Sequence, residues 1–66
     1  MLAETITTAL DHLWYEIWQD FDGENNVFKA VRYDAEMGNL QTVAVEWKKS
    51  HAKRMVRYDM ARLGIA

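Results

Sequence analysis

The 66-residue sequence predicts an α+β fold in which a helix, a β-hairpin and a second helix follow one another. Apolar residues recur every three or four positions over residues 2–21 and again over residues 49–63, as in amphipathic helices. Between them, residues 27–34 and 40–47 are rich in β-branched and aromatic side chains that alternate at period two. A chain of this length forms one domain, residues 1–66. The expected architecture is αββα, with two helices packed on a two-stranded antiparallel hairpin.

The first predicted helix covers residues 2–21 and has a wide apolar face. Its repeating apolar residues are Leu2, Ile6, Leu10, Leu13 and Ile17. Trp14, Trp18 and Phe21 lie beside this stripe at helical spacing, and we expect most of the combined surface to be core. Gly23 supplies a positive φ at the expected end of the helix.

The predicted hairpin has apolar side chains on both of its faces. Gly38 or Asn39 is expected to take the left-handed conformation in the connecting loop. Because both faces are apolar, the hairpin needs cover on both sides, from the two helices or from the hairpin of a second copy.

The last predicted helix, residues 49–63, has a narrower apolar face and a glycine at its end. The apolar residues are Ala52, Met55, Val56, Met60 and Leu63. Gly64 is positioned as the C-cap, and basic residues in the last turns suit the negative end of the helix dipole.

Composition indicates a folded protein of a reducing compartment. Half of the residues are hydrophobic and there is no cysteine, so no disulfide framework is available. The N-terminal segment lacks the basic and apolar blocks of a signal peptide, and no stretch reaches the roughly 20 apolar residues of a membrane span. We therefore expect a soluble cytoplasmic protein with no membrane partner.

Charge is divided unevenly along the chain. Residues 1–26 contain six acidic and no basic side chains, whereas residues 27–66 contain all eight basic side chains and four acidic ones. The two parts either neutralise each other inside the fold or present two faces to partners. Self-neutralisation is the favoured reading.

The basic residues of the last helix form one candidate binding surface, for nucleic acid or an acidic partner. They are Lys49, Lys53, Arg54, Arg57 and Arg62. Such a helix could track phosphates. Because the net charge is −2 and the pI about 5.5, nucleic acid is the less favoured partner.

An acidic and aromatic stretch of the first predicted helix forms the other candidate surface. Its residues are Asp11, Tyr15, Glu16, Gln19 and Asp20. An exposed tyrosine among acidic side chains resembles a protein-binding hot spot, and it suits a partner with a basic surface.

The sequence offers no arrangement that predicts catalysis, a metal site or a cofactor. His12 and His51 are the two histidines, and no cysteine completes a zinc set. Ser50 and His51 are adjacent on a predicted helix, where neighbouring side chains do not face each other. We expect a protein that is not an enzyme and that binds no metal or cofactor.

The leading hypothesis is a small protein-binding regulator or inhibitor. Short, acidic, cysteine-free chains resemble the tiny phage inhibitors of host machinery, anti-CRISPR proteins among them. This resemblance implies a phage or mobile-element protein that blocks a host defence or regulatory complex by occupying its surface. A homodimer is a further expectation, and a nucleic-acid-binding regulator is one alternative.

A second alternative is a virion component. The predicted order of helix, hairpin and helix is similar to the small head-to-tail joining proteins of tailed phages. This similarity in element order and length implies a structural role.

Overall fold

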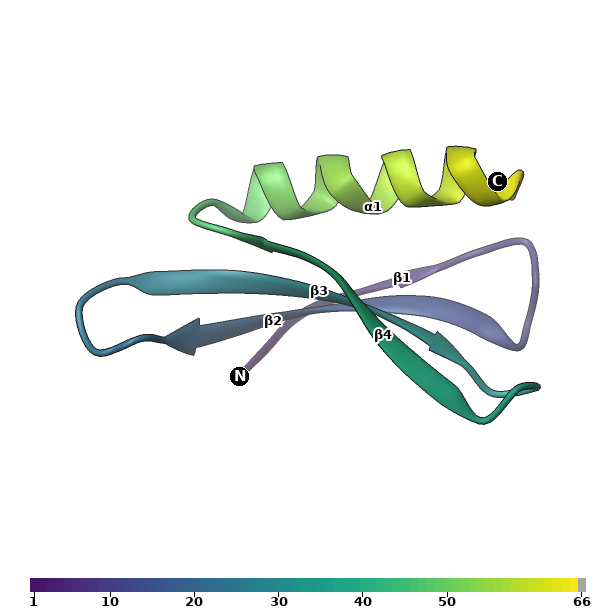
Figure 1. Ribbon diagram of the computed structural model, residues 1–66, viewed down its shortest axis with the longest axis horizontal. Helices are drawn as coiled ribbons and strands as arrows, with labels where there is room; N and C mark the ends of the chain where they lie inside the picture. Colours follow the sequence, from purple (N-terminus) through teal and green to yellow (C-terminus); the bar gives the residue numbers. More distant parts are fainter. Residues whose placement is uncertain (66) are drawn as a thin grey trace.

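Residues 1–65, which the computed structural model describes, form one four-stranded antiparallel sheet followed by one C-terminal helix (Figure 1). The elements are β1 (Leu2–Thr7), β2 (Leu13–Phe21), β3 (Asn26–Asp34), β4 (Asn39–Glu46) and α1 (Lys49–Leu63). Strands that are consecutive in sequence are neighbours in the sheet, in the order β1-β2-β3-β4. The architecture is therefore ββββα.

The predicted αββα fold is wrong in its N-terminal third. Residues 2–21 form the two strands β1 and β2 rather than a helix. The apolar residues of this segment recur at helical spacing only if β1, β2 and the turn between them are treated as one continuous helix. Within β2 the side chains alternate between a largely apolar face and a face that carries Trp14 and Trp18 beside Glu16 and Asp20, and aromatic and β-branched residues favour strands. The similarity to the head-to-tail joining proteins in element order is therefore wrong as well, whereas the virion role that it implied stays a prediction.

The turn that separates β1 from β2 is stabilised by Thr8. Its hydroxyl accepts a hydrogen bond from the Leu10 N–H at 3.1 Å and lies 2.7 Å from the Leu13 carbonyl oxygen, to which it donates. Threonine side chains that bond to nearby backbone groups favour turns over helices. This local contact ends β1 within residues 2–21, the segment that was predicted to be one continuous helix.

The last two strands and the helix lie within one residue of their predicted bounds. Gly38 has a φ of 70° in the β3–β4 turn, and Gly64 has a φ of 73° at the C-cap of α1, as predicted. Gly23, predicted to end a helix, lies instead in the turn between β2 and β3, with a φ of 102°.

The core lies between α1 and one face of the sheet. Figure 1 shows the helix running along one side of the sheet, and residues 1–65 place no helix or strand on the other side. Five residues, from β2, β3 and α1, are fully buried in this layer: Tyr15, Ile17, Ala30, Ala52 and Val56. The two alanines leave room for the helix to approach the strands closely. We call this side of the sheet the covered face and the other side the open face.

Candidate functional site

A buried network of polar side chains joins the helix to the covered face. The Asp59 carboxylate on α1 accepts hydrogen bonds from the Tyr15 hydroxyl and from the Arg32 guanidinium, each at 2.6 Å. Arg62, one turn further along α1, donates to the other carboxylate oxygen at 2.6 Å. The second terminal nitrogen of Arg32 donates to Gln41 on β4 at 2.9 Å. This network fixes the helix against three strands.

The network shifts the acid–base equilibria of its members. Burial raises the pKa of Tyr15 to about 12, and its hydrogen bond to Asp59 adds to the effect. For Asp59, burial is the largest single effect and raises the pKa, but the hydrogen bonds from Tyr15, Arg32 and Arg62 outweigh it and hold the pKa below its ordinary value. The carboxylate therefore stays charged, and two arginines compensate its charge.

A second tie between the helix and the sheet lies at the start of α1. Lys49 and Lys53 place their ammonium groups 3.0 and 3.3 Å from the two oxygens of Glu4 on β1. Hydrogen bonds from Lys49 and Lys53 lower the pKa of Glu4. The acidic and basic parts of the sequence thus partly neutralise each other, as the charge pattern predicted.

The open face presents an apolar surface. Its side chains belong to the residues that alternate with the core residues along the strands. The larger apolar members are Trp14 and Trp18 on β2, Tyr33 on β3, and Leu40 and Val45 on β4. Val31 on β3 belongs to the same face but is buried. The rings of Trp14 and Tyr33, which are paired across the strands, stack with centroids 5.5 Å apart and planes inclined by 6°. Leu40 and Val45 are 62% and 56% exposed.

Glu16 lies at the centre of this surface, between the two tryptophans. The indole N–H of Trp14 donates to one carboxylate oxygen at 3.1 Å, and that of Trp18 donates to the other at 2.9 Å. Its cross-strand neighbours, Thr5 and Val31, are uncharged. Among the described residues no lysine or arginine nitrogen lies within 4.0 Å of the Glu16 carboxylate. We call Trp14, Glu16 and Trp18 the indole-carboxylate site.

Tyr33 also responds to the carboxylate of the indole-carboxylate site. Burial raises the pKa of the Tyr33 hydroxyl, and the negative charge of Glu16 and a side-chain hydrogen bond with Glu16 add to this effect. The influence of Glu16 therefore extends from β2 to β3 across the open face.

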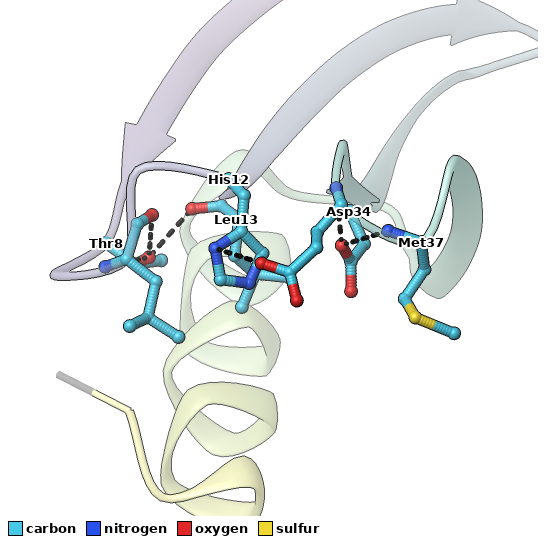
Figure 2. A network of polar contacts seen from close by, with 7 residues as sticks. Thr8, His12, Leu13, Asp34 and Met37 are labelled. Carbon is cyan, nitrogen blue, oxygen red and sulfur yellow. Dashed lines mark hydrogen bonds and ion pairs between the residues drawn. The ribbon is translucent and has the colours of Figure 1, made fainter.

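A hollow of about 300 Å³ lies beside the Trp14–Tyr33 stack, at the end of the sheet where β3 turns into β4. Leu40 and Asn39 form part of its wall. Figure 2 shows the two turns at this end of the sheet lying next to each other. The Asp34 carboxylate accepts backbone N–H bonds from Glu36 and Met37 at 3.0 and 2.9 Å, which fixes the β3–β4 turn.

The two turns are also joined to each other. The His12 carbonyl accepts the Ala35 N–H at 2.8 Å. The His12 imidazole Nδ1 also lies 3.6 Å from a Glu36 carboxylate oxygen, a contact marked in Figure 2. A second hollow, of about 330 Å³, lies on the covered side between α1 and β4, lined in part by Met55, Tyr58 and Arg62.

The residues of the predicted acidic surface do not form one surface. Because the segment is a strand and not a helix, Tyr15 points into the core and is 0% exposed, so the expected exposed tyrosine is wrong. Gln19 lies on the covered side, opposite Phe28. Glu16 and Asp20 share the open face, and Asp11 is exposed in the β1–β2 turn.

The predicted basic residues all lie on α1 but in different environments. Lys49 and Lys53 pair with Glu4, and Arg62 pairs with Asp59. Arg54 and Arg57 are exposed, and within the described chain neither has an acidic oxygen within 4.0 Å. The five residues therefore form no single stripe of free positive charge.

Sequence reasoning assigned Trp14 and Trp18 to the core and did not single out Tyr33 or Arg32. Trp14 and Trp18 are half-buried on the open face, and Phe21 is 66% exposed. The signal that could have found the indole-carboxylate site is the period-two pattern Trp14, Glu16, Trp18, read as a strand.

Over residues 1–65, no cluster of three or more histidine, cysteine, aspartate or glutamate side chains is arranged to hold a metal ion. The same part of the chain contains no helix with the length and apolarity that crossing a bilayer requires. Comparisons of the chain with models of protein families, with curated proteins and with solved structures gave no match.

Proposed function

We propose that this chain is a non-enzymatic binding protein that docks a partner protein on the open face of its sheet and acts by occupying the partner's surface. The observation that carries the proposal is the one-sided covering of the sheet. The helix packs on one face, while two half-buried tryptophans, a half-buried tyrosine and two exposed aliphatic side chains remain on the other. An apolar surface of this kind on a small protein is typical of an interaction site.

The chemistry of the open face supports protein binding. Tryptophan and tyrosine are enriched among the residues that contribute most to the affinity of protein complexes. Here they project from the two central strands of the sheet, and both indole N–H groups are held by Glu16. Side chains that are ordered before binding lose less conformational entropy when a partner docks.

A pair of lysine variants tests the use of the open face. Leu40→Lys combined with Val45→Lys adds two charges to the open face at positions that contribute no side chain to the core. The matched control, Tyr58→Lys with Leu63→Lys, adds the same charge to exposed positions of α1. Each protein would be used as bait in a lysate of the source cells, with and without nuclease, followed by mass spectrometry.

The proposal predicts a stoichiometric protein partner that survives nuclease treatment, is lost with the open-face variant and is kept by the helix control. Retention of the partner by the open-face variant would contradict it. Identification of the partner also tests the narrower hypothesis of a phage or mobile-element inhibitor of a host complex. If the partner is a second copy, sedimentation of the purified protein will show a dimer that the open-face variant abolishes.

Nucleic acid is the second candidate partner, favoured by the exposed Arg54 and Arg57 on α1. Against it, three of the six basic residues between Trp47 and Gly64 are engaged with Glu4 or Asp59. Arg54→Glu with Arg57→Glu separates the two candidates. Loss of a nuclease-sensitive, salt-dependent complex in this variant would favour the helix over the open face.

A further inference from the structure

The indole-carboxylate site holds a negative charge that pairs with no lysine or arginine of residues 1–65. On the covered face, Asp59 pairs with two arginines and Glu4 pairs with two lysines. On the open face, Asp20 lies 3.8 Å from the Lys29 ammonium group. Glu16, half-buried between Trp14 and Trp18, has neutral donors alone within hydrogen-bond distance.

The two indole donors leave a defined part of the carboxylate free. A carboxylate has about four lone-pair positions, two on each oxygen. Trp14 and Trp18 bond to different oxygens and so occupy one position on each. The Tyr33 hydroxyl also interacts with this carboxylate. At least one further position remains, and an N–H group of an incoming guanidinium can bond there.

The surroundings of Glu16 also select for a cation that tolerates apolar contact. The indole ring faces attract positive charge through their quadrupoles. A guanidinium is planar, is more weakly hydrated than an ammonium and stacks on aromatic rings, whereas a lysine ammonium remains a compact, strongly hydrated charge. The carboxylate geometry and the aromatic frame therefore favour the same group.

We propose that the indole-carboxylate site is a receptor for an arginine side chain presented by the partner protein, with Glu16 accepting the guanidinium and the two tryptophans enclosing it. This inference rests on the proposed function, because it names the chemistry of the partner that docks on the open face. A partner surface with an arginine set among apolar residues matches this face, and docking would pair the carboxylate that the free protein leaves without a cation.

The indole N–H signals of the three tryptophans give a direct test by ¹⁵N NMR. The probe is the tripeptide acetyl-Ile-Arg-Ile-amide, and the control is the same peptide with neutral citrulline in place of arginine. We expect the arginine peptide to shift the Trp14 and Trp18 indole signals with millimolar affinity. The Trp47 indole lies outside the site, is 62% exposed and serves as the internal reference.

Two variants make the test specific to the carboxylate. Glu16→Gln keeps the size of the side chain but removes its charge, and we expect it to weaken the peptide about tenfold, the loss typical of a charge-assisted hydrogen bond. Asp20→Asn removes a carboxylate from the same face and should leave the affinity within about twofold. The remaining amide signals of each variant report whether the fold is kept.

Equal shifts with the citrulline peptide, equal affinity for Glu16→Gln, or no shift of the Trp14 and Trp18 signals would each overturn the arginine receptor. The proposed function would survive those results if the lysine variants of the open face still lost their protein partner. The converse result is that those variants keep the partner while the arginine peptide binds as expected. In that case the open-face docking proposal fails, although the site still binds an arginine side chain.

Discussion

The two faces of the sheet hold two carboxylates in contrasting environments. On the covered face, Asp59 receives a tyrosine O–H and two arginines. On the open face, Glu16 receives two indole N–H groups and no cation from the described chain. Both groups are held by aromatic donors, but the charge of Asp59 is balanced within the fold and that of Glu16 is not.

This difference separates what stabilises the protein from what is available to a partner. A charge taken out of water must be paired, or its desolvation destabilises the folded state. Asp59 on α1 is paired in this way with Arg32 and Arg62. Glu16 meets part of this requirement through neutral donors and is only half-buried. The covered network therefore stabilises the fold, whereas the open site is where we propose that a partner binds.

The largest expected effect comes from neutralising the covered carboxylate. Asp59→Asn leaves the half-buried Arg32 without its counterion and replaces an acceptor of the Tyr15 hydroxyl. Removing one partner of a buried ion pair costs about 3–5 kcal/mol. Since a chain of this length has a stability of about 3–10 kcal/mol, the variant should unfold at much lower denaturant. Chemical denaturation followed by circular dichroism measures the change, and a loss below about 1 kcal/mol would contradict this account.

A core truncation on the same face should come next. Ile17 is 0% exposed and packs in the layer between β2 and α1. Ile17→Ala removes buried methylene groups and leaves a cavity, for which we expect a loss of about 3 kcal/mol in the free energy of unfolding. The control is Val45→Thr on the open face, where the side chain is 56% exposed and the change should stay within about 0.5 kcal/mol. Similar losses for both variants would mean that the open face is as tightly packed as the covered one.

Alkaline pH tests the covered network without a core truncation. The pKa of Tyr15 is raised to about 12 in the folded state, so folding favours the protonated phenol. Its contribution to stability is full below the ordinary tyrosine pKa near 10 and is lost as pH rises through 12. We expect the free energy of unfolding to fall by about 2 kcal/mol between pH 10 and pH 12. Denaturation at several pH values measures this change. Tyr15→Phe provides the control, and its stability should fall less steeply over the same range.

The C-terminal half of the fold was predictable because its signals are local. The alternation over β3 and β4 and the helical spacing of Ala52 and Val56 each belong to one element, and glycines mark the turn and the helix end. In the N-terminal third, the spacing of the apolar residues fits both the 3.6-residue period of a helix and the two-residue period of a strand. This segment forms strands because β2 is hydrogen-bonded to β1 on one side and to β3 on the other. That pairing involves residues outside the segment, so the local sequence pattern does not predict it.

The wrong secondary structure also hid the candidate site. On a helix the neighbours of Glu16 are three and four residues away, whereas on a strand its same-face neighbours are Trp14 and Trp18. The Tyr15–Asp59 contact joins residues 44 positions apart, so its burial could not be derived from either segment alone. Glu16 was named as a binding residue, but its partners and the face it occupies come from the sheet.

A smaller effect is expected when one indole donor of the open site is removed. Trp18→Phe keeps an aromatic ring on β2 but loses the N–H that lies 2.9 Å from Glu16. Because Glu16 is only half-buried, water can replace this donor. We therefore expect the free energy of unfolding to fall by about 0.5–1 kcal/mol. Denaturation measures it, with Trp47→Phe at an exposed position as the control.

The smallest effect should come from neutralising Glu16 itself, which is the counterpart of Asp59→Asn. In Glu16→Gln the amide oxygen still accepts one indole N–H, while the amide nitrogen faces the other and loses that bond. The loss, about 1 kcal/mol, is offset because a half-buried charge with no cation no longer has to be desolvated. The two effects oppose each other, so the free energy of unfolding should change by less than about 1 kcal/mol. Equal destabilisation by Glu16→Gln and Asp59→Asn would show that the open carboxylate is as much a part of the fold as the covered one.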